Sequence, residues 1–194
     1  MYKYDWVSGG YDYLQDFGMS PRNSAIAGYI IAAAKKPCTI LDVACGLCPI
    51  FPFLPEKIIT RYVAFDNSEY VDSQMPYKGL KNFEFYRLSF EDFFSNASIK
   101  TGSFDFVLYF GMYGGYDVYA ERLERLLPYT RKDGYVILEA IDEHISDVLS
   151  VMKDKHPGYN EIASCSMQVY GNTLSGVTRE RFRSIHLYES NQSK

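Results

Sequence analysis

The stretch at residues 39–49, TILDVACGLCP, decides the fold class of this chain. It is an apolar run that leads through the carboxylate Asp42 into a loop of small residues. A second apolar run, YVAF at residues 62–65, ends in another carboxylate, Asp66, which lies 20 residues beyond Gly46. Small residues let a ligand lie against the backbone of a tight turn, and an acid on the next strand can accept hydrogen bonds from ribose hydroxyls. The two runs together are typical of a nucleoside-binding α/β domain.

Outward from this stretch, apolar β-rich runs alternate with helical segments. We expect a helix that begins with Ser20 as its N-cap and ends before Pro37, and further helices at 118–127 and 145–155. The near-continuous apolar runs suit strands covered on both faces, and these strands are expected at residues 39–43, 61–65, 83–88, 104–110 and 134–140. Two last strands, 166–170 and 182–188, have no helix between them and must pair antiparallel. The pattern predicts an α/β fold, a three-layer, doubly wound, mostly parallel seven-stranded sheet with an antiparallel C-terminal strand.

Size and charge set limits on organisation and partners. The 194 residues predict a single domain, with an aromatic N-terminal arm at 1–20 and a sheet core at 39–188. The net charge of -4 argues against nucleic acid as the main partner. The sequence has no apolar run of the roughly 20 residues that would span a bilayer and no start typical of a signal peptide, so we expect no membrane partner and a cytoplasmic location. The oligomeric state stays open.

Four cysteines raise the question of metal or redox chemistry: Cys38, Cys45, Cys48 and Cys165. The Cys45-x-x-Cys48 pair could be a redox pair or half of a metal site. A structural zinc site normally needs four ligands, and the sequence has no second paired motif and no nearby histidine pair. We therefore interpret both cysteines as small residues of the loop and predict no metal site.

Asp42, Gly46 and Asp66 resemble the first two motifs of the class I S-adenosylmethionine-dependent methyltransferases, whose loop usually reads Asp/Glu-x-Gly-x-Gly-x-Gly. Gly46 holds the middle glycine position here, while Ala44 and Cys48 stand at the other two. Alanine is expected to fit where φ is negative, and Cys48 before Pro49 narrows the space near a ligand or changes the path of the loop. The antiparallel tail also resembles this family, whose sheet ends with an inserted antiparallel strand. The implied fold is the Rossmann-like methyltransferase fold.

The resemblance implies S-adenosylmethionine as the cofactor. Asp42 would reach its ammonium group, the turn at Ala44 and Gly46 would hold its amino-acid part, and Asp66 would accept from both ribose hydroxyls. Ser89 occupies the position of the usual adenine-binding Asp. The other implied cofactor residues are Asn67, Phe90 and Phe110. Asp66 could instead cap the helix that follows, and Ser89 could belong to a plain loop before a helix.

The acceptor side rests on the segment after residue 110. Met112 and Tyr113 would line the pocket, and Tyr13 of the aromatic arm would cover it. The Asn/Asp-Pro-Pro-Tyr/Phe motif of DNA and protein-amide methylases is absent from this place, which favours a small-molecule acceptor with a reactive oxygen or nitrogen. His144 follows the fifth expected strand and is the candidate general base, because its unperturbed pKa suits that task. It could equally be an exposed residue near a helix start.

Two other function classes stay open. A methyltransferase-like protein without catalytic activity, such as a subunit of a complex, would explain the irregular loop and Ser89. A nicotinamide-dependent oxidoreductase could use the same acid, Asp66. The depleted glycine loop disfavours it, because a pyrophosphate needs a closer approach to the backbone than Ala44 and Cys48 would allow.

Overall fold

The computed structural model describes residues 20–110, 116–172 and 178–191. Its centre is a seven-stranded sheet with the strand order β3-β2-β1-β4-β5-β7-β6. The strands are β1 Cys38–Val43, β2 Ile59–Asp66, β3 Phe83–Arg87, β4 Phe104–Phe110, β5 Thr130–Ile141, β6 Tyr159–Asn172 and β7 Thr178–Ser190. Only the pairings of β7 with β5 and with β6 are antiparallel. The predicted fold class is confirmed.

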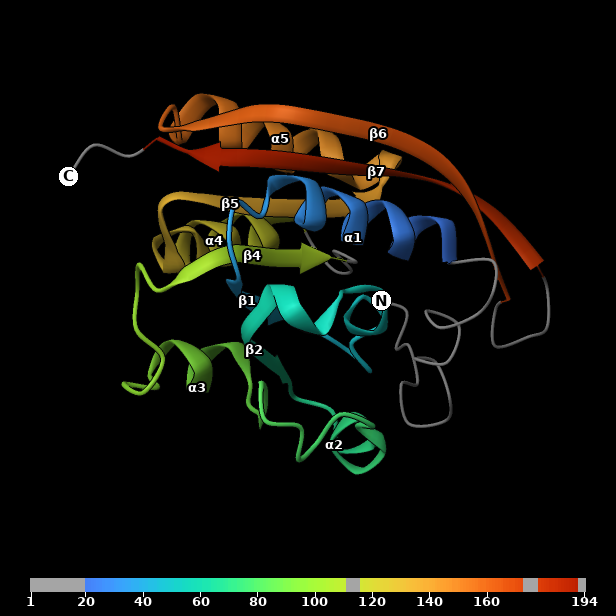
Figure 1. Ribbon diagram of the computed structural model, residues 1–194. Coiled ribbons are helices and arrows are strands. Elements are labelled where there is room, and N and C mark those ends of the chain that lie inside the picture. Colours follow the sequence, from blue (N-terminus) through green and yellow to red (C-terminus); the bar gives the residue numbers. More distant parts are fainter. Residues whose placement is uncertain (1–19, 111–115, 173–177, 192–194) are drawn as a thin grey trace.

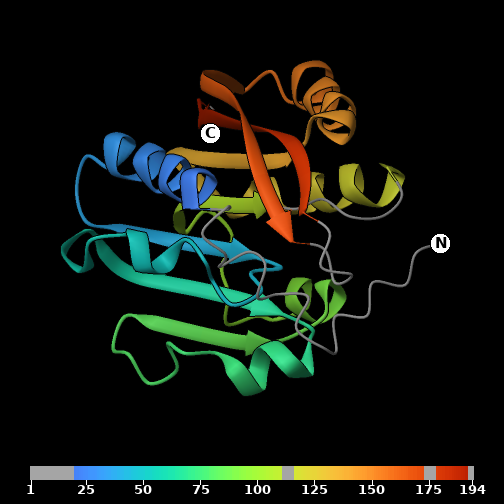
Figure 2. The same cartoon turned by 90° about the vertical axis from the view of Figure 1, so that its right-hand side faces the viewer.

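Helices cover both faces of the sheet and make three layers. They are α1 Ser20–Ala33, α2 Glu69–Gln74, α3 Phe90–Phe94, α4 Tyr116–Leu126 and α5 Asp142–Lys155. Short 3-10 turns lie at η3 Phe51–Phe53, η4 Glu56–Ile58 and η5 Leu127–Tyr129. Figure 2 shows α1 on one side of the sheet and α4 and α5 on the other. None of the helices in the described ranges is long and apolar enough to cross a membrane.

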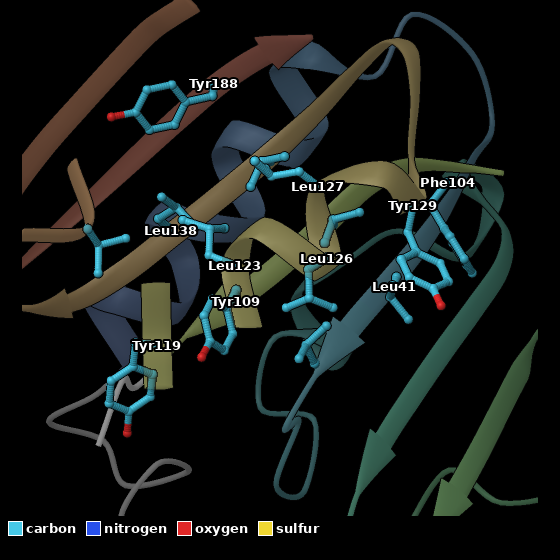
Figure 3. Packing of buried hydrophobic residues seen from close by; sticks show 14 of the residues in the cluster. Leu41, Phe104, Tyr109, Tyr119, Leu123, Leu126, Leu127, Tyr129, Leu138 and Tyr188 are labelled. Atoms are coloured by element: carbon cyan, nitrogen blue, oxygen red, sulfur yellow. The ribbon is translucent and has the colours of Figure 1, made fainter. Parts of the chain in front are cut away.

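The alternation of side chains along each strand divides the core into two. On the α4 and α5 side, Leu41, Val107 and Leu138 pack against Leu123 and Leu126 of α4, as Figure 3 shows in part. On the α1 side, strand residues such as Ile40 and Ile137 pack against Ile26 and Ile30. Toward the carboxyl ends of the strands, this second side carries Asp42 in β1, Asp66 in β2 and Glu139 in β5, which belong to the site described below.

The tail differs from its expected length. β6 and β7 are 14 and 13 residues long, whereas the sequence predicted two short strands. Pairing of β5 with β7 ends at Ile141 and Arg183, but pairing of β6 with β7 continues to Asn172 and Thr178. The hairpin therefore runs past the carboxyl end of β4 (Figure 1). The full length of β6 was not predicted, because its polar and apolar residues alternate and an edge strand with exposed side chains carries no continuous apolar run.

A second difference concerns residues 131–134, which precede all but the first residue of the strand expected at 134–140. These residues lie within β5, where the register with β4 shifts between Phe104 and Phe106. Asp133 adopts a positive φ of 58° and the strand continues beyond it. The strand therefore begins earlier than its apolar run.

A candidate nucleoside site at the rim of the sheet

The loop after β1 has a left-handed backbone at every second residue. Ala44, Gly46 and Cys48 have φ values of 52°, 53° and 52°. Alanine was expected to fit where φ is negative, and the structure has Ala44 at a positive φ instead. An L-residue in this conformation costs roughly 1–2 kcal/mol. The loop holds it because the Cys45 N–H donates to the Phe65 carbonyl at 3.1 Å, and the Cys48 N–H donates to the Cys45 carbonyl at 3.0 Å.

The Cys48 side chain is fully buried in the core on the α1 side. Burial raises the pKa of its thiol to about 11 and raises the pKa of Cys45 well above its usual range. Both residues therefore stay neutral thiols at neutral pH and serve as small core residues. In the described part of the chain, no group of three or more metal-ligating side chains comes together.

Asp66 ties this loop to the end of β2. Its Oδ2 accepts from the Gly46 N–H at 3.1 Å and its Oδ1 accepts from the Ser68 N–H at 2.9 Å. The N-cap of α2 is Ser68, whose hydroxyl accepts from the Val71 N–H. Asp66 is thus a loop anchor as well as a candidate ligand residue. A carboxylate offers about four acceptor positions, so a group of this type can accept from several donors at once.

Asp42 lies on the next strand and on the same face as Asp66. It is 1% exposed, and its Oδ2 accepts from the Tyr62 hydroxyl of β2 at 2.5 Å. Its Oδ1 is buried and has no hydrogen-bond partner within the described ranges. Burial raises the pKa of Asp42 to about 7, against the opposing effects of the Tyr62 hydrogen bond and the positive charge of Arg22.

These residues fit the nucleoside that the fold family implies. Among the described residues, Oδ1 of Asp42 is an acceptor without a donor, and a buried ammonium group would supply that donor. Asp66 is a carboxylate at the end of the neighbouring strand, and Asn67 lies exposed directly after it. Asp42, Ala44, Gly46, Asp66 and Asn67 are therefore brought together at the carboxyl ends of β1 and β2, where ligands of open α/β sheets bind.

Ser89 and Phe90 are engaged in the fold itself. Ser89 is the N-cap of α3, since its Oγ accepts from the Asp92 N–H at 3.2 Å and donates to the Asp92 carboxylate at 2.6 Å. The Phe90 ring packs on the side of α3 and α4, where the Arg122 guanidinium lies 4.2 Å from its centroid. The Phe90 ring is therefore on the face opposite to Asp42 and Asp66.

A buried cluster of charged residues lies at the β5 end of this edge of the sheet. Glu139 of β5 is fully buried, accepts from Arg22 of α1 at 2.7 Å and forms a second ion pair with Arg183 of β7. Burial alone would raise the pKa of Glu139, but the two guanidiniums outweigh it and lower the pKa to about 2. Phe110, at the end of β4, packs here, with the Arg22 guanidinium 4.9 Å from its ring centroid.

Neither this cluster nor the contact of Tyr62 with Asp42 was predicted from the sequence. Arg22 and Glu139 are 117 residues apart, and no local motif connects them. A charged residue in an otherwise apolar strand, as Glu139 is, was the one signal that the sequence offered.

The predicted acceptor residues remain predictions. Tyr13, Met112 and Tyr113 lie outside the described residues. His144 is in the first turn of α5, directly after β5, but its side chain is also outside the described part. Its backbone position is at the carboxyl end of β5, the same edge of the sheet as Asp42.

The fold has clear counterparts among solved structures, although no protein-family model and no curated protein matches the sequence. The PH0226 protein of Pyrococcus horikoshii OT3 is 16% identical with a TM-score of 0.69, over 98% of this chain and 99% of that one. The Burkholderia thailandensis 1,6-didemethyltoxoflavin-N1-methyltransferase, solved with S-adenosylhomocysteine, is 16% identical with a TM-score of 0.66, over 97% and 86%. A putative RNA methyltransferase of Pyrococcus horikoshii, PH1948, is 8% identical with a TM-score of 0.62, over 87% and 83%.

These likenesses show the fold: the chain has the class I methyltransferase fold, as the sequence motifs implied.

Proposed function

We propose that this protein transfers a methyl group from S-adenosylmethionine to an oxygen or nitrogen of a small molecule. The observation that carries the proposal is the pair of carboxyls, Asp42 and Asp66, which lie on neighbouring strands, on one face, at the carboxyl rim. Asp42 would accept from the ammonium group, Asp66 would accept from the ribose, and the turn at Ala44 and Gly46 would hold the amino-acid part. When bound, S-adenosylmethionine supplies an electrophilic methyl group on a sulfonium.

The chain's own residues would contribute mainly by positioning. Methyl transfer is an in-line displacement, in which proximity and orientation supply much of the rate. A base is needed only when the acceptor must lose a proton, and His144 at the start of α5 is the candidate for that role. Phe110, beside the buried ion-pair cluster, would form part of the wall between cofactor and acceptor.

Charge supports a small-molecule acceptor over a nucleic acid. The net charge is -4, and Arg22 and Arg183 are buried against Glu139 rather than presented to phosphates. One structural counterpart is a methyltransferase of a small molecule, and this comparison favours the same acceptor class. Another counterpart is a putative RNA methyltransferase, so an RNA acceptor is the alternative that a substrate screen has to include.

A second candidate is a methyltransferase-like protein that binds a nucleoside without turnover. Ser89, at the expected adenine position, is already engaged as a helix cap. The first and last glycine positions of the loop are non-glycine residues in a strained conformation. Binding with no methyl transfer to any acceptor in a broad screen would favour this candidate.

Calorimetry with S-adenosylhomocysteine, with NADH as the competing ligand, tests the proposal. We expect binding of the first and none of the second. Asp66→Ala should weaken that binding at least about tenfold, because a charge-assisted hydrogen bond contributes about 1.5–3 kcal/mol. The matched control is Asp72→Ala, which removes a carboxylate that only pairs with Lys78 at the surface of α2. Unchanged affinity in Asp66→Ala would remove the ribose assignment, and absence of binding to the wild type would remove the proposed function.

A further inference from the structure

Asp42 is a buried carboxyl whose charge is not balanced nearby. It takes part in no ion pair within the described ranges, and one of its oxygens lacks a hydrogen-bond partner there. Arg22 approaches it from α1, but the two terminal nitrogens of Arg22 already donate to Glu139 and Asn23. An isolated ionised carboxylate is costly to bury, so burial favours the neutral, protonated form of Asp42.

The groups that face Asp42 come from three elements. Arg22 of α1 favours the ionised form, Asp66 of β2 opposes it, and the hydrogen bond from Tyr62 of β2 favours it. Cys45 and Cys48 of the loop stay neutral thiols, because burial raises their pKa values. The pKa of Tyr62 is raised well above its usual range by burial and by Asp42. The pKa of Asp42 itself is raised to about 7 by its burial.

Leu108 of β4 and Ala64 of β2 lie beside Asp42 in register and add no charge. The Tyr62 ring is fixed by its neighbours. It stacks on Phe83 with the ring centroids 5.6 Å apart and packs edge-on against Phe51 with the centroids 5.0 Å apart. Its hydroxyl is thus held where it reaches Asp42. Tyr62 is a positioning residue for the carboxyl.

We propose that Asp42 holds a proton in the ligand-free protein and releases it when an ammonium group binds, and that Tyr62 sets the pH range of this exchange. The inference rests on the proposed function, because the ammonium group belongs to the amino-acid part of the nucleoside. The step balances: the Asp42 O–H bond breaks, the proton passes to solvent, and the ligand N–H donates to the carboxylate. One positive charge enters the pocket and one leaves.

Calorimetric titration of S-adenosylhomocysteine in two buffers of different ionisation enthalpy measures the protons released. We expect a large fraction of one proton per ligand at about pH 6 and little at about pH 8, because Asp42 is mostly ionised there. 5′-Methylthioadenosine, a nucleoside without the ammonium group, should bind with no proton release at either pH. Buffer-independent heats for S-adenosylhomocysteine would overturn the inference and leave the proposed function standing. No binding at all would remove the proposed function and this inference with it.

Variants test the roles of Asp42 and Tyr62 separately. Asp42→Asn should abolish the proton release. Tyr62→Phe keeps the ring and removes the hydrogen bond to the carboxylate, so binding at neutral pH should weaken several-fold and release should persist to higher pH. The matched control is Tyr135→Phe, which removes a hydroxyl–carboxylate contact to Glu189 on the same face, in the middle of β5. A Tyr62→Phe profile identical to that of the wild type would contradict the role of Tyr62.

A measurement on the wild-type protein, which needs no variant, covers the case in which a variant fails to fold. Carboxyl carbon NMR of the wild-type protein should show one aspartate that titrates near neutrality and shifts when S-adenosylhomocysteine is added. If every aspartate titrates below about pH 5, the bound proton does not exist and the inference is wrong.

Discussion

Glu139 and Asp42 lie on the same face of the sheet and are both almost fully buried, yet their pKa values move in opposite directions. Glu139 meets two guanidiniums, and its pKa falls to about 2. Asp42 meets one hydroxyl, and its pKa rises to about 7. At one end of the rim the fold completes its own charge pairing and ties α1, β5 and β7 together. At the other end it leaves a carboxyl whose counter-charge a ligand would bring.

The largest effect on stability should come from removing the Glu139 carboxylate, which pairs with Arg22 and Arg183. Glu139→Gln would remove the carboxylate charge that both buried guanidiniums contact, and breaking such a buried ion pair typically costs about 3–5 kcal/mol. Denaturant unfolding at neutral pH measures it. Asp42→Asn is the control from the other end of the rim and should cost little or increase stability. Equal losses in the two variants would contradict the contrast between the two carboxyls.

The pH dependence of stability sharpens the same comparison. The folded-state pKa of Glu139 is lowered, so its contribution is present above about 4.5 and is lost as the pH falls toward about 2. The folded-state pKa of Asp42 is raised from 3.8 to about 7, so the unfolded state binds fewer protons and stability falls as the pH rises between these values. The limiting slope is about 1.4 kcal/mol per pH unit for each group.

Thermal unfolding across this range, with and without Asp42→Asn, separates the two groups. The variant should lose the decline between about pH 4 and 7 and keep the acid limb of Glu139. A variant that follows the wild-type curve throughout would show that Asp42 is ionised in the folded protein.

The smallest effect on stability concerns the strained loop after β1, which lies beside Asp42. Ala44→Gly should stabilise the protein by about 0.5–1 kcal/mol, since Ala44 is exposed and glycine adopts a φ of 52° without strain. Chemical denaturation of the two proteins measures the gain. Cys48→Gly relieves the same strain but removes a buried side chain, so it should lose stability instead. A loss in Ala44→Gly would show that the loop conformation is not strained.

Much of the fold could be predicted from the sequence because apolar periodicity is local. The strand predicted at 104–110 has these same ends in the structure, and the strand predicted at 39–43 begins one residue earlier, at Cys38. Asp42 and Asp66 were expected on adjacent strands and lie there, held by the loop at Gly46. The positive φ of Ala44 could not be predicted, because hydrogen bonds to the end of β2, rather than residue preference, set the backbone there.

The sequence by itself determined the parallel sheet, its antiparallel end and the two carboxyls at the rim. Those features follow from apolar runs and from residues at fixed positions after them. The tertiary structure alone decided which buried carboxyl is paired. Arg22, Glu139 and Arg183 meet only once α1, β5 and β7 are packed, and Tyr62 reaches Asp42 only once β1 and β2 are in register. Electrostatic energy depends on distance in space and on burial, and neither is written in local sequence.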